Sequence, residues 1–361
     1  MKIAFDFQIF SFQKFGGISR YFCDLATSLN TATPGSVRVV SPLHVNGYLE
    51  NMTAKVVGIG VPEVRNSKKI VRSINLFASN LYLKSYSPDV LHETYYSTSA
   101  VKVDCPRIVT VFDMINEKFP VYFKNNGIMR EKKAAIDRAD RLICISEQTK
   151  SDLIEYMGID PGKISVVYLG HSGFPIPNPM ETVSNERPYF LYVGNREGYK
   201  NFELFVRAFA SCSALNKLRI VCFGGGRFTL EELKLFASLN LDAERVHQIN
   251  GDDSVLANLY ANAELFVYPS LYEGFGIPPL EAMSCNCPVA CSNTSSIPEV
   301  VGNAAAYFDP TSLDSMKDSM CKILDDSEFR STLVARGVER VKLFSWEKCS
   351  RETLDVYRSV T

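Results

Sequence analysis

The sequence predicts an α/β protein made of two domains, each a parallel sheet wound by helices. Short β-branched or aromatic runs alternate with segments of helix length, the pattern of parallel strands joined by crossover helices. The alternation occurs once in each half of the chain. A length of 361 residues also suits two hydrophobic cores better than one.

Six runs in each half are predicted to be strands. In the first half they are Lys2–Phe7, Val37–Val40, Val90–His92, Ile108–Val111, Arg141–Ile145 and Ile164–Tyr168. In the second half they are Tyr189–Val193, Arg219–Phe223, Val246–Ile249, Leu265–Tyr268, Val289–Ala290 and Ala306–Phe308. We therefore expect one domain over residues 1–172 and another over residues 189–344.

Two segments fall outside these domains. Residues 173–188 contain four prolines and read as an interdomain linker. Residues 345–361 predict a C-terminal helix with Ser345 as its N-cap, because Leu354 and Tyr357 belong to an apolar stripe behind it. The sequence does not indicate where this helix packs.

The composition excludes several classes of protein. Hydrophobic residues make up 46% and charged residues 22%, as in folded soluble proteins. A formal net charge of −1 argues against nucleic acid as a partner. Asp6 interrupts the apolar N-terminus, and no apolar run reaches the ~18 residues of a membrane span. We therefore expect a cytoplasmic protein.

The ten cysteines do not form a recognisable framework. Most stand singly in apolar stretches, as buried thiols do, in a chain without an export signal. Cys285, Cys287 and Cys291 are close together, but their spacing matches no familiar zinc site and no histidine lies nearby. We predict no metal site.

Residues 265–283 combine a buried-strand pattern, a turn with Gly274 and Gly276, and a helix with Pro278 and Pro279 in its first turn. A helix N-terminus offers unpaired N–H groups and a positive dipole, and glycine lets the backbone approach a ligand closely. The segment therefore predicts a site for an anionic ligand.

Two glutamates of this segment are expected to lie at different depths of one cleft. Glu273 lies in the loop, and Glu281 follows eight positions later, about two turns into the helix. Their separation predicts different roles in one cleft. The alternative is that the two prolines only begin a helix and that Glu281 only caps this helix or forms an ion pair on it.

The run from Tyr268 to Glu281, Tyr-Pro-Ser-Leu-Tyr-Glu-Gly-Phe-Gly-Ile-Pro-Pro-Leu-Glu, resembles glycosyltransferase family 4. Residues 281–289, 295–299 and 305–310 extend the resemblance. It implies a GT-B fold, in which two Rossmann-like domains face each other across a cleft, and sugar transfer with retention. It also implies that Glu273 contacts the donor sugar and Glu281 the nucleotide ribose. Donor-binding backbone would come from Phe275, Gly276 and Ile277.

One residue departs from that family pattern. Asn286 stands where the family usually has glycine. Asparagine is the residue besides glycine that best tolerates positive φ. We expect the turn to be kept.

A second motif follows the first strand of the second domain and includes Gly194, Arg196 and Lys200. The two cations are predicted to project from the loop and neutralise a leaving diphosphate without a metal. The alternative is a solvent-exposed loop in which both cations only face water. The family pattern, which has a Lys-Asn pair after an upstream cation, favours diphosphate binding.

The first domain offers weaker candidates. Gly16 and Gly17 allow close backbone approach, and the resemblance places such a pair opposite the donor. Asp113 and His92 are the candidate catalytic groups, with Phe112 where many family members have a histidine. Either candidate can instead be structural, Asp113 as a helix cap and His92 as a hydrogen-bonded strand-end histidine.

A helix over residues 67–81 would place four apolar side chains on one face, close to three cations. The apolar residues are Ile70, Ile74, Phe77 and Leu81, and the cations are Lys68, Lys69 and Arg72. Such a helix could touch an anionic membrane surface as a peripheral contact. We favour the alternative, in which the apolar face packs into the core.

The segments at residues 192–196 and 112–115 resemble bacterial mannosyltransferases of O-antigen and capsule synthesis. The resemblance implies GDP-mannose as donor, a glycan or polyprenyl-linked acceptor, no metal cofactor, and work in the cytoplasm or at the inner face of its membrane. A UDP-sugar or another GDP-sugar is an alternative donor. A sugar-nucleotide epimerase and a non-catalytic nucleotide-sugar binding protein are alternative functions.

Overall fold

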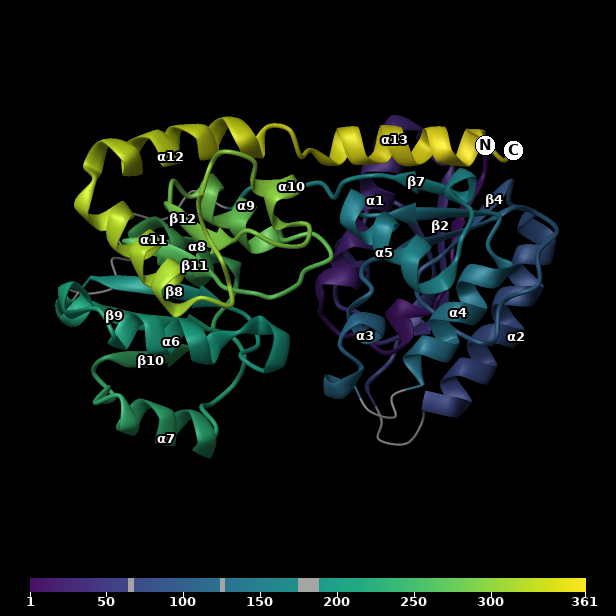
Figure 1. The fold of residues 1–361 in the computed structure, drawn as a ribbon. Coiled ribbons are helices and arrows are strands. Elements are labelled where there is room, and N and C mark those ends of the chain that lie inside the picture. Colours follow the sequence, from purple (N-terminus) through teal and green to yellow (C-terminus); the bar gives the residue numbers. More distant parts are fainter. Residues whose placement is uncertain (64–67, 124–126, 175–187) are drawn as a thin grey trace. The chain divides into compact units, whose positions relative to one another are not determined.

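The computed structural model describes residues 1–63, 68–123, 127–174 and 188–361. The chain divides into two compact units, coloured along the sequence in Figure 1. Unit 1 comprises Met1–Gly170 with Ser345–Thr361, and unit 2 comprises His171–Phe344. Most of the predicted linker, residues 175–187, lies outside the described residues. The two-domain α/β prediction is confirmed.

The described strands of unit 1 form a seven-stranded parallel sheet in the order β3-β2-β1-β4-β5-β6-β7. They are β1 (Ile3–Phe5), β2 (Val37–His44), β3 (Lys55–Gly60), β4 (Val90–Glu93), β5 (Arg107–Val111), β6 (Arg141–Cys144) and β7 (Ile164–Val166). The strand order reverses between β1 and β4, which makes this pair the topological switch point of the sheet.

Strand β3 is the one described strand that the sequence analysis missed. It is an edge strand with mostly exposed residues, and Gly58 and Gly60 interrupt its β-branched run. Gly58 has φ +158°, and a Cβ there would lie 1.7 Å from the carbonyl oxygen of Ser41. The register of β2 and β3 shifts between Val40 and Leu43. Glycine therefore permits a close backbone approach beside this irregularity.

Helices cover both faces of the unit 1 sheet. The α-helices are α1 (Gly17–Ala32), α2 (Lys68–Tyr86), α3 (Ile115–Lys118), α4 (Ile128–Arg138), α5 (Glu147–Met157) and α13 (Trp346–Arg358). The short 3₁₀ helices are η1 (Ile9–Ser11), η2 (Tyr48–Asn51), η3 (Pro120–Tyr122) and η4 (Pro161–Lys163). On one face α1 packs against α13, while α2 packs on β2, α4 on β5 and α5 on β6 and β7.

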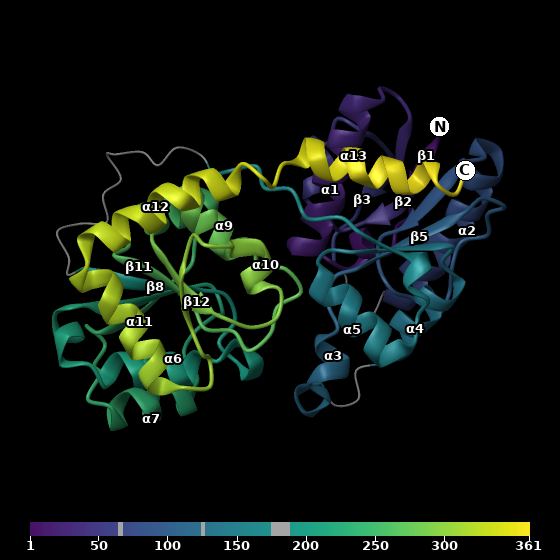
Figure 2. The ribbon, with the colours of Figure 1, turned by 45° about the horizontal axis from the view of Figure 1, so that its top comes forward.

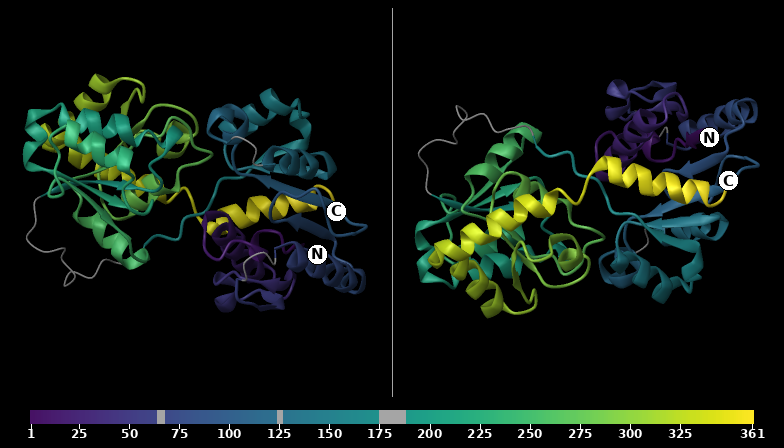
Figure 3. Two further views of the ribbon diagram at one scale, coloured as in Figure 1. Left: turned by 90° about the horizontal axis from the view of Figure 1, so that it is seen from below. Right: turned by 90° about the horizontal axis from the view of Figure 1, so that it is seen from above.

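The C-terminal helix α13 belongs to unit 1, a placement that the sequence left open. It lies along α1 and the sheet of that unit in Figure 3. Its N-cap, Ser345, accepts a hydrogen bond from the backbone N–H of Lys348, as predicted. Ser28 of α1 donates to the carbonyl oxygen of Trp346 at 3.0 Å. Tyr357 reaches the core, where it meets His92.

The described strands of unit 2 form a six-stranded parallel sheet in the order β10-β9-β8-β11-β12-β13. They are β8 (Tyr189–Val193), β9 (Arg219–Phe223), β10 (Val246–Ile249), β11 (Leu265–Tyr268), β12 (Val289–Ser292) and β13 (Ala306–Phe308). All six were predicted, with β12 two residues longer than expected. Here the strand order reverses between β8 and β11.

The helices of unit 2 form two groups, which meet where the last two helices of the unit contact each other. The α-helices are α6 (Phe202–Ala210), α7 (Leu230–Ser238), α8 (Asp253–Asn262), α9 (Ile277–Ser284), α10 (Ile297–Val301), α11 (Leu313–Asp325) and α12 (Ser327–Val341), with the 3₁₀ helices η5 (Gly198–Lys200) and η6 (Ser213–Lys217). Helix α6 contacts α7 and α11, and α9 contacts α8, α10 and α12. Figure 2 shows α9 and α10 side by side.

Candidate functional site

The carboxyl ends of the parallel strands in unit 2 bring predicted donor-binding residues together. Lys200 follows β8, Glu273 follows β11, and these two strands are neighbours in the sheet. Open α/β sheets bind ligands outside the carboxyl ends of their strands, at the switch point. The Lys200 Nζ lies 2.7 Å from Oε1 of Glu273. An ion pair therefore spans the switch point of unit 2.

This ion pair is partly accessible and held by its neighbours. The side chains of Lys200 and Glu273 are 21% and 10% exposed. The backbone N–H of Leu271 donates to the carbonyl oxygen of Tyr199 at 2.7 Å, which ties the two loops together. Tyr268 hydrogen-bonds Glu273, and burial together with that carboxylate raises the pKa of the Tyr268 hydroxyl well above its usual range. The phenol therefore stays a donor.

Asn201 fixes the loop that carries Lys200. It adopts the left-handed conformation with φ +58° at the start of α6. Its side-chain amide donates to the carbonyl oxygens of Pro269 at 3.0 Å and Pro310 at 2.7 Å. The position of Lys200 is thus set by a residue that bridges to two other loops.

Two serines hold the loop that carries Glu273, and the sequence analysis assigned them no role. Ser295 accepts from the backbone N–H of Glu273 at 3.2 Å and donates to its carbonyl oxygen at 2.7 Å. Ser296 is fully buried and donates to the carbonyl oxygens of Glu273 and Phe275. The signal available in the sequence was the resemblance at residues 295–299.

The turn after Glu273 leads into the N-terminus of α9. Gly276 caps this helix with φ +113°, a conformation that favours glycine. Pro278 and Pro279 follow Ile277, and prolines carry no N–H group. The donors that this end of α9 can offer an anion are therefore those of Ile277 and the residues before it, and their role in donor binding stays a prediction.

Glu281 lies in the second turn of α9 and has its own tyrosine partner. The hydroxyl of the fully buried Tyr260, from α8, donates to Oε2 of Glu281 at 3.2 Å. Burial and this carboxylate raise the pKa of Tyr260 well above its usual range. The two glutamates thus stand on different elements, each with a buried phenol beside it. At the far end of α9, Asn286 has φ +58°, so the predicted turn is confirmed.

Arg196 does not project from its loop as expected. Its guanidinium is buried, with Nε 2.6 Å from Oε1 of Glu232. Its terminal nitrogens donate to the carbonyl oxygens of four consecutive residues, Gly224, Gly225, Gly226 and Arg227. A Cβ on Gly225 would lie 2.6 Å from Arg196 Nη1 and 2.7 Å from the carbonyl oxygen of Gly194. Arg196 therefore organises the glycine turn, and this geometry does not support direct contact with a diphosphate.

His92 is in the core of unit 1, away from any accessible surface. It is fully buried, with Nδ1 2.6 Å from the hydroxyl of Tyr357 and Nε2 2.9 Å from Oγ1 of Thr110. Burial lowers its pKa to about 3, so the imidazole is neutral near neutral pH. Both nitrogens are used within the fold. The structural alternative for His92 is the one that the geometry favours, not the catalytic one.

Asp113 also has a structural role. Its Oδ1 accepts from the backbone N–H of Ile115 at 3.0 Å, at the start of α3, as in the capping alternative. Lys132 lies 4.0 Å from the same oxygen and 2.8 Å from Glu117. The Asp113 side chain is 32% exposed, so it keeps access to solvent.

Gly16 and Gly17 lie at the N-terminus of α1, after β1. A Cβ on Gly16 would lie 2.4 Å from the side-chain amide of Gln13, whose oxygen accepts from the backbone N–H of Ser19. A Cβ on Gly17 would meet no atom within 4 Å. Gly16 thus makes room for a capping side chain, and Gly17 faces open space.

Asp6, at the carboxyl end of β1, is a buried polar residue that the sequence analysis used only to exclude a signal peptide. Its Oδ1 accepts from the backbone N–H of Gln8 and from both the N–H and the hydroxyl of Thr94. Within the described residues its Oδ2 has no hydrogen-bond partner. Burial, and then the nearby Glu93, raises the pKa of Asp6 to about 7.

Comparison with known proteins identifies the family. "Glycosyl transferases group 1" matches residues 179–340, and "Glycosyltransferase Family 4" matches residues 15–171. The O-antigen chain mannosyltransferase B of Escherichia coli is 32% identical over 267 residues, which are 70% of this chain and 70% of that protein. The chain belongs to glycosyltransferase family 4. It is therefore a nucleotide-sugar-dependent hexosyltransferase.

Another relative of this glycosyltransferase and two solved structures agree with the family assignment and the fold. The O-antigen chain mannosyltransferase RfbU of Salmonella typhimurium is 27% identical over 310 residues, 81% of this chain and 83% of that protein. Sucrose-phosphate synthase from Thermosynechococcus elongatus superposes with a TM-score of 0.78 at 19% identity, over 99% of this chain and 98% of that one. Anabaena Alr3699/HepE gives 0.75 at 17% identity, over 99% and 100%. These structures confirm the GT-B fold.

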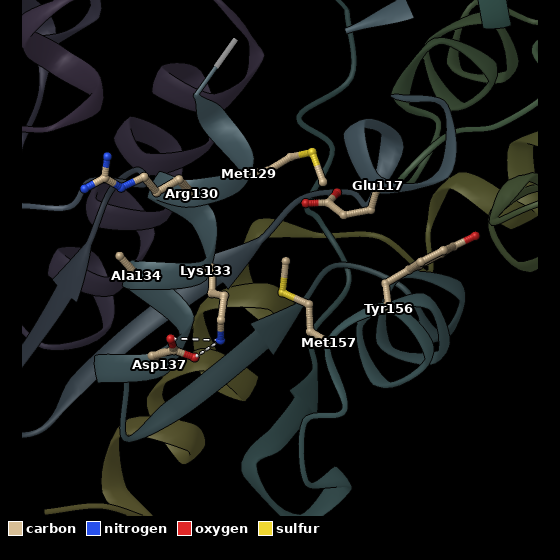
Figure 4. Close-up of a pocket in the computed structure, with 8 residues that line it drawn as sticks. All are labelled: Glu117, Met129, Arg130, Lys133, Ala134, Asp137, Tyr156 and Met157. Carbon is tan, nitrogen blue, oxygen red and sulfur yellow. Dashed lines mark hydrogen bonds and ion pairs between the residues drawn. The ribbon is translucent and has the colours of Figure 1, made fainter. Parts of the chain in front are cut away.

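Unit 1 of the glycosyltransferase also carries an open groove, shown in Figure 4. Its volume is about 650 Å³, and it lies between α3, α4 and α5. The lining residues are Glu117, Met129, Arg130, Lys133, Ala134, Asp137, Tyr156 and Met157. Lys133 is paired with Asp137 at 3.0 Å. None of the predicted site residues lines this groove.

Proposed function

We propose that this glycosyltransferase moves mannose from GDP-mannose onto a glycan or lipid-linked oligosaccharide in the synthesis of a cell-surface polysaccharide. Two relatives that match most of the chain are named O-antigen chain mannosyltransferases, which supports both the sugar and the acceptor class. The observation that carries the transfer chemistry is the Lys200–Glu273 ion pair across the switch point of unit 2.

In this proposal Lys200 stabilises the leaving nucleoside diphosphate. Negative charge grows on the diphosphate as the bond between its oxygen and the anomeric carbon breaks. An ammonium group and backbone N–H groups already in place lower the free energy of that transition state. The N–H groups come from Phe275, Gly276 and Ile277, before and at the start of α9. The acceptor hydroxyl oxygen forms the new bond to the anomeric carbon, and its proton passes to the departing diphosphate oxygen.

Glu273 and Glu281 take the two polar ends of the donor. Glu273 binds the sugar, where its carboxylate complements the positive charge that develops at the anomeric carbon. Glu281 accepts hydrogen bonds from ribose hydroxyls. When donor binds, Lys200 shares its charge between Glu273 and the diphosphate. We propose that attack occurs on the face that the leaving group departs from, which gives retention of configuration.

We propose that the reaction needs no metal ion, because Lys200 supplies the positive charge at the diphosphate. Transfer measured in excess EDTA should then equal transfer measured with added magnesium. A large loss of activity in EDTA, restored by the metal, would contradict this part of the proposal. We place the reaction in the cytoplasm, where nucleotide sugars are the donors.

A UDP-hexose is the second candidate donor. The Anabaena protein of the same fold was solved in complex with UDP and glucose. Thermal unfolding of the full chain with GDP, UDP, dTDP, CMP and their sugars separates the candidates, because a ligand that binds the folded state raises the midpoint. The largest rise is expected with GDP and GDP-mannose. A larger rise with UDP would reassign the base.

Two other functions are tested by the reaction itself. An epimerase would convert the nucleotide sugar without any acceptor. A non-catalytic binding protein would bind the nucleotide tightly and show neither hydrolysis nor transfer. We expect transfer of radiolabelled mannose only when a glycan acceptor is present.

A further inference from the structure

Helix α2 of unit 1 packs on its sheet through a face that mixes polar and apolar residues. The apolar residues of this face are Leu76, Tyr82, Leu83 and Tyr86. Asn75 is fully buried, with Oδ1 accepting from the backbone N–H of Leu43 at 2.7 Å and Nδ2 donating to its carbonyl oxygen at 2.9 Å. Ser79 and Leu83 are buried on the same face. Two hydrogen bonds to the backbone of β2 thus fix which side of α2 faces the protein.

The opposite face of α2 is apolar and exposed. At 100° per residue, four large side chains fall on one narrow stripe, directly opposite Asn75 and Ser79. They are Ile70, Ile74, Phe77 and Leu81, and they are 65%, 45%, 74% and 67% exposed. The expectation that this stripe packs into the core is therefore wrong. Asn75, bonded to the backbone of Leu43, and the buried Leu83 hold the other face of α2 against the protein, so the stripe faces outward.

The charges on α2 have one sign. Residues 68–86 contain three lysines and one arginine and no acidic residue, although the formal net charge of the chain is −1. Arg72 is engaged with Glu131 at 3.8 Å and with the hydroxyl of Ser97. Lys68, Lys69 and Lys84 are exposed. The last two lie on one flank of the apolar stripe.

We propose that α2 docks unit 1 onto an anionic lipid bilayer. The apolar stripe would enter the interface, and Lys69 and Lys84 would meet the headgroups. A helix with an apolar face and basic flanks binds anionic bilayers in the plane of the interface. Ile70 and Leu81 are eleven positions apart, so the stripe is about 16 Å long. No helix in the described part of the chain has the length and hydrophobicity to cross a bilayer.

The lysines of α2 favour an anionic bilayer over a second copy of the chain as the partner of the apolar stripe. Two α2 helices facing each other would bring the lysines of one copy against those of the other, and like charges oppose association. An anionic surface instead complements them. The proposal does not depend on the donor, and it adds a surface to the proposed transfer onto lipid-linked acceptors.

The test is co-flotation of the full chain with vesicles of phosphatidylcholine alone or with 30% phosphatidylglycerol. We expect binding to the anionic vesicles only. Phe77→Ser with Leu81→Ser should weaken it at least tenfold. Lys69→Gln with Lys84→Gln should weaken it by about 25-fold, roughly fivefold for each lysine. All four side chains are exposed, so the thermal midpoint should not fall.

The matched controls lie in unit 2. Leu230→Ser with Leu233→Ser changes two exposed apolar residues of α7, and Lys217→Gln with Lys234→Gln changes two exposed lysines. Both double variants should bind vesicles like the wild type. Because the vesicles contain no acceptor and no donor, failure of the transfer proposal leaves this result intact.

Three results would overturn the docking proposal. One is a wild-type chain that does not float with anionic vesicles. Another is binding that survives Phe77→Ser with Leu81→Ser. The third is a dimer of the wild type in light scattering that this double variant converts to monomer, because the stripe would then be a self-association surface.

Discussion

The two sheets have switch points of the same topology, but their charged residues differ in burial. In unit 2 the pair β8 and β11 carries an ion pair, Lys200 with Glu273, whose side chains keep contact with solvent. In unit 1 the strand β1 leads into Asp6, which is buried and belongs to no described ion pair, while Glu93 at the end of β4 is buried and paired with Arg107 and Arg138. Hydrogen bonds that Thr94 donates to the carboxylate of Asp6 join the ends of the two strands.

The difference shows how one topology serves two purposes. Where a cation stands at the strand ends, the site can receive an anionic ligand and neutralise its charge. Where a buried carboxyl is tied to the neighbouring strand, its hydrogen bonds serve the fold instead. The predictions below separate binding from stability at these positions.

Glu273→Gln should have the largest effect on transfer. The amide keeps the shape of the side chain but loses the charge near the anomeric carbon, so we expect a loss of roughly 1000-fold in kcat, about 4 kcal/mol. Affinity for GDP should change little. The matched control is Glu203→Gln, in an exposed ion pair of α6 with Arg207, which should transfer normally. Unchanged transfer by Glu273→Gln would refute its assignment.

Arg196→Met should reduce stability rather than ligand binding. It leaves the partly buried Glu232 without its cation and removes donors from four carbonyl oxygens. Breaking a buried ion pair in this way costs about 3 kcal/mol or more, which should appear as a lower thermal midpoint. GDP affinity of the fraction that stays folded should be nearly unchanged. A normal midpoint with a lost affinity for GDP would return Arg196 to the diphosphate site.

Lys200→Ala should show the reverse pattern. We expect GDP affinity and transfer to fall about 10- to 100-fold, because one charge-assisted contact to the diphosphate is lost. Lys200→Met, which keeps the length of the side chain, should lose as much affinity. Isothermal titration with GDP measures this directly. If either variant binds GDP like the wild type, the diphosphate assignment of Lys200 fails.

The sequence predicted the sheets better than the directions of side chains. Eleven of the twelve runs in which buried strands were expected lie within three residues of the observed boundaries, because alternation and apolar runs are local properties. The β2 strand extends further, to His44. No local pattern places Glu273 beside Lys200. The role of Glu273 was predicted from the family resemblance, and its contact with Lys200 follows from the pairing of β8 with β11.

Where sequence reasoning failed, a distant contact decided the outcome. Arg196 turned inward because the carbonyl groups of residues 224–227 and Glu232 surround it. The apolar stripe of α2 turned outward because Asn75 pairs with the backbone of Leu43. Neither partner is close in sequence, so periodicity and local charge could not reveal them.

Asp6→Asn gives the smallest predicted effect and tests the switch point of unit 1. Burial, and then Glu93, raises the pKa of Asp6 from 3.8 to about 7. The folded chain then binds this proton more tightly than the unfolded chain, so stability falls as the pH rises from about 4 through 7. Asparagine keeps the accepting oxygen but cannot ionise. Between pH 5 and pH 8, the thermal midpoint of the variant should therefore fall a few degrees less than that of the wild type.

The comparison needs a control that reports on ordinary surface charge. Asp137→Asn changes an aspartate of the same unit that is half exposed and paired with Lys133, and its midpoint should follow the wild-type course with pH. If Asp6→Asn follows that course as well, the carboxyl of Asp6 is not the group that titrates. The contrast between the two switch points would then rest on hydrogen bonding alone, since Thr94 would still join β1 to β4.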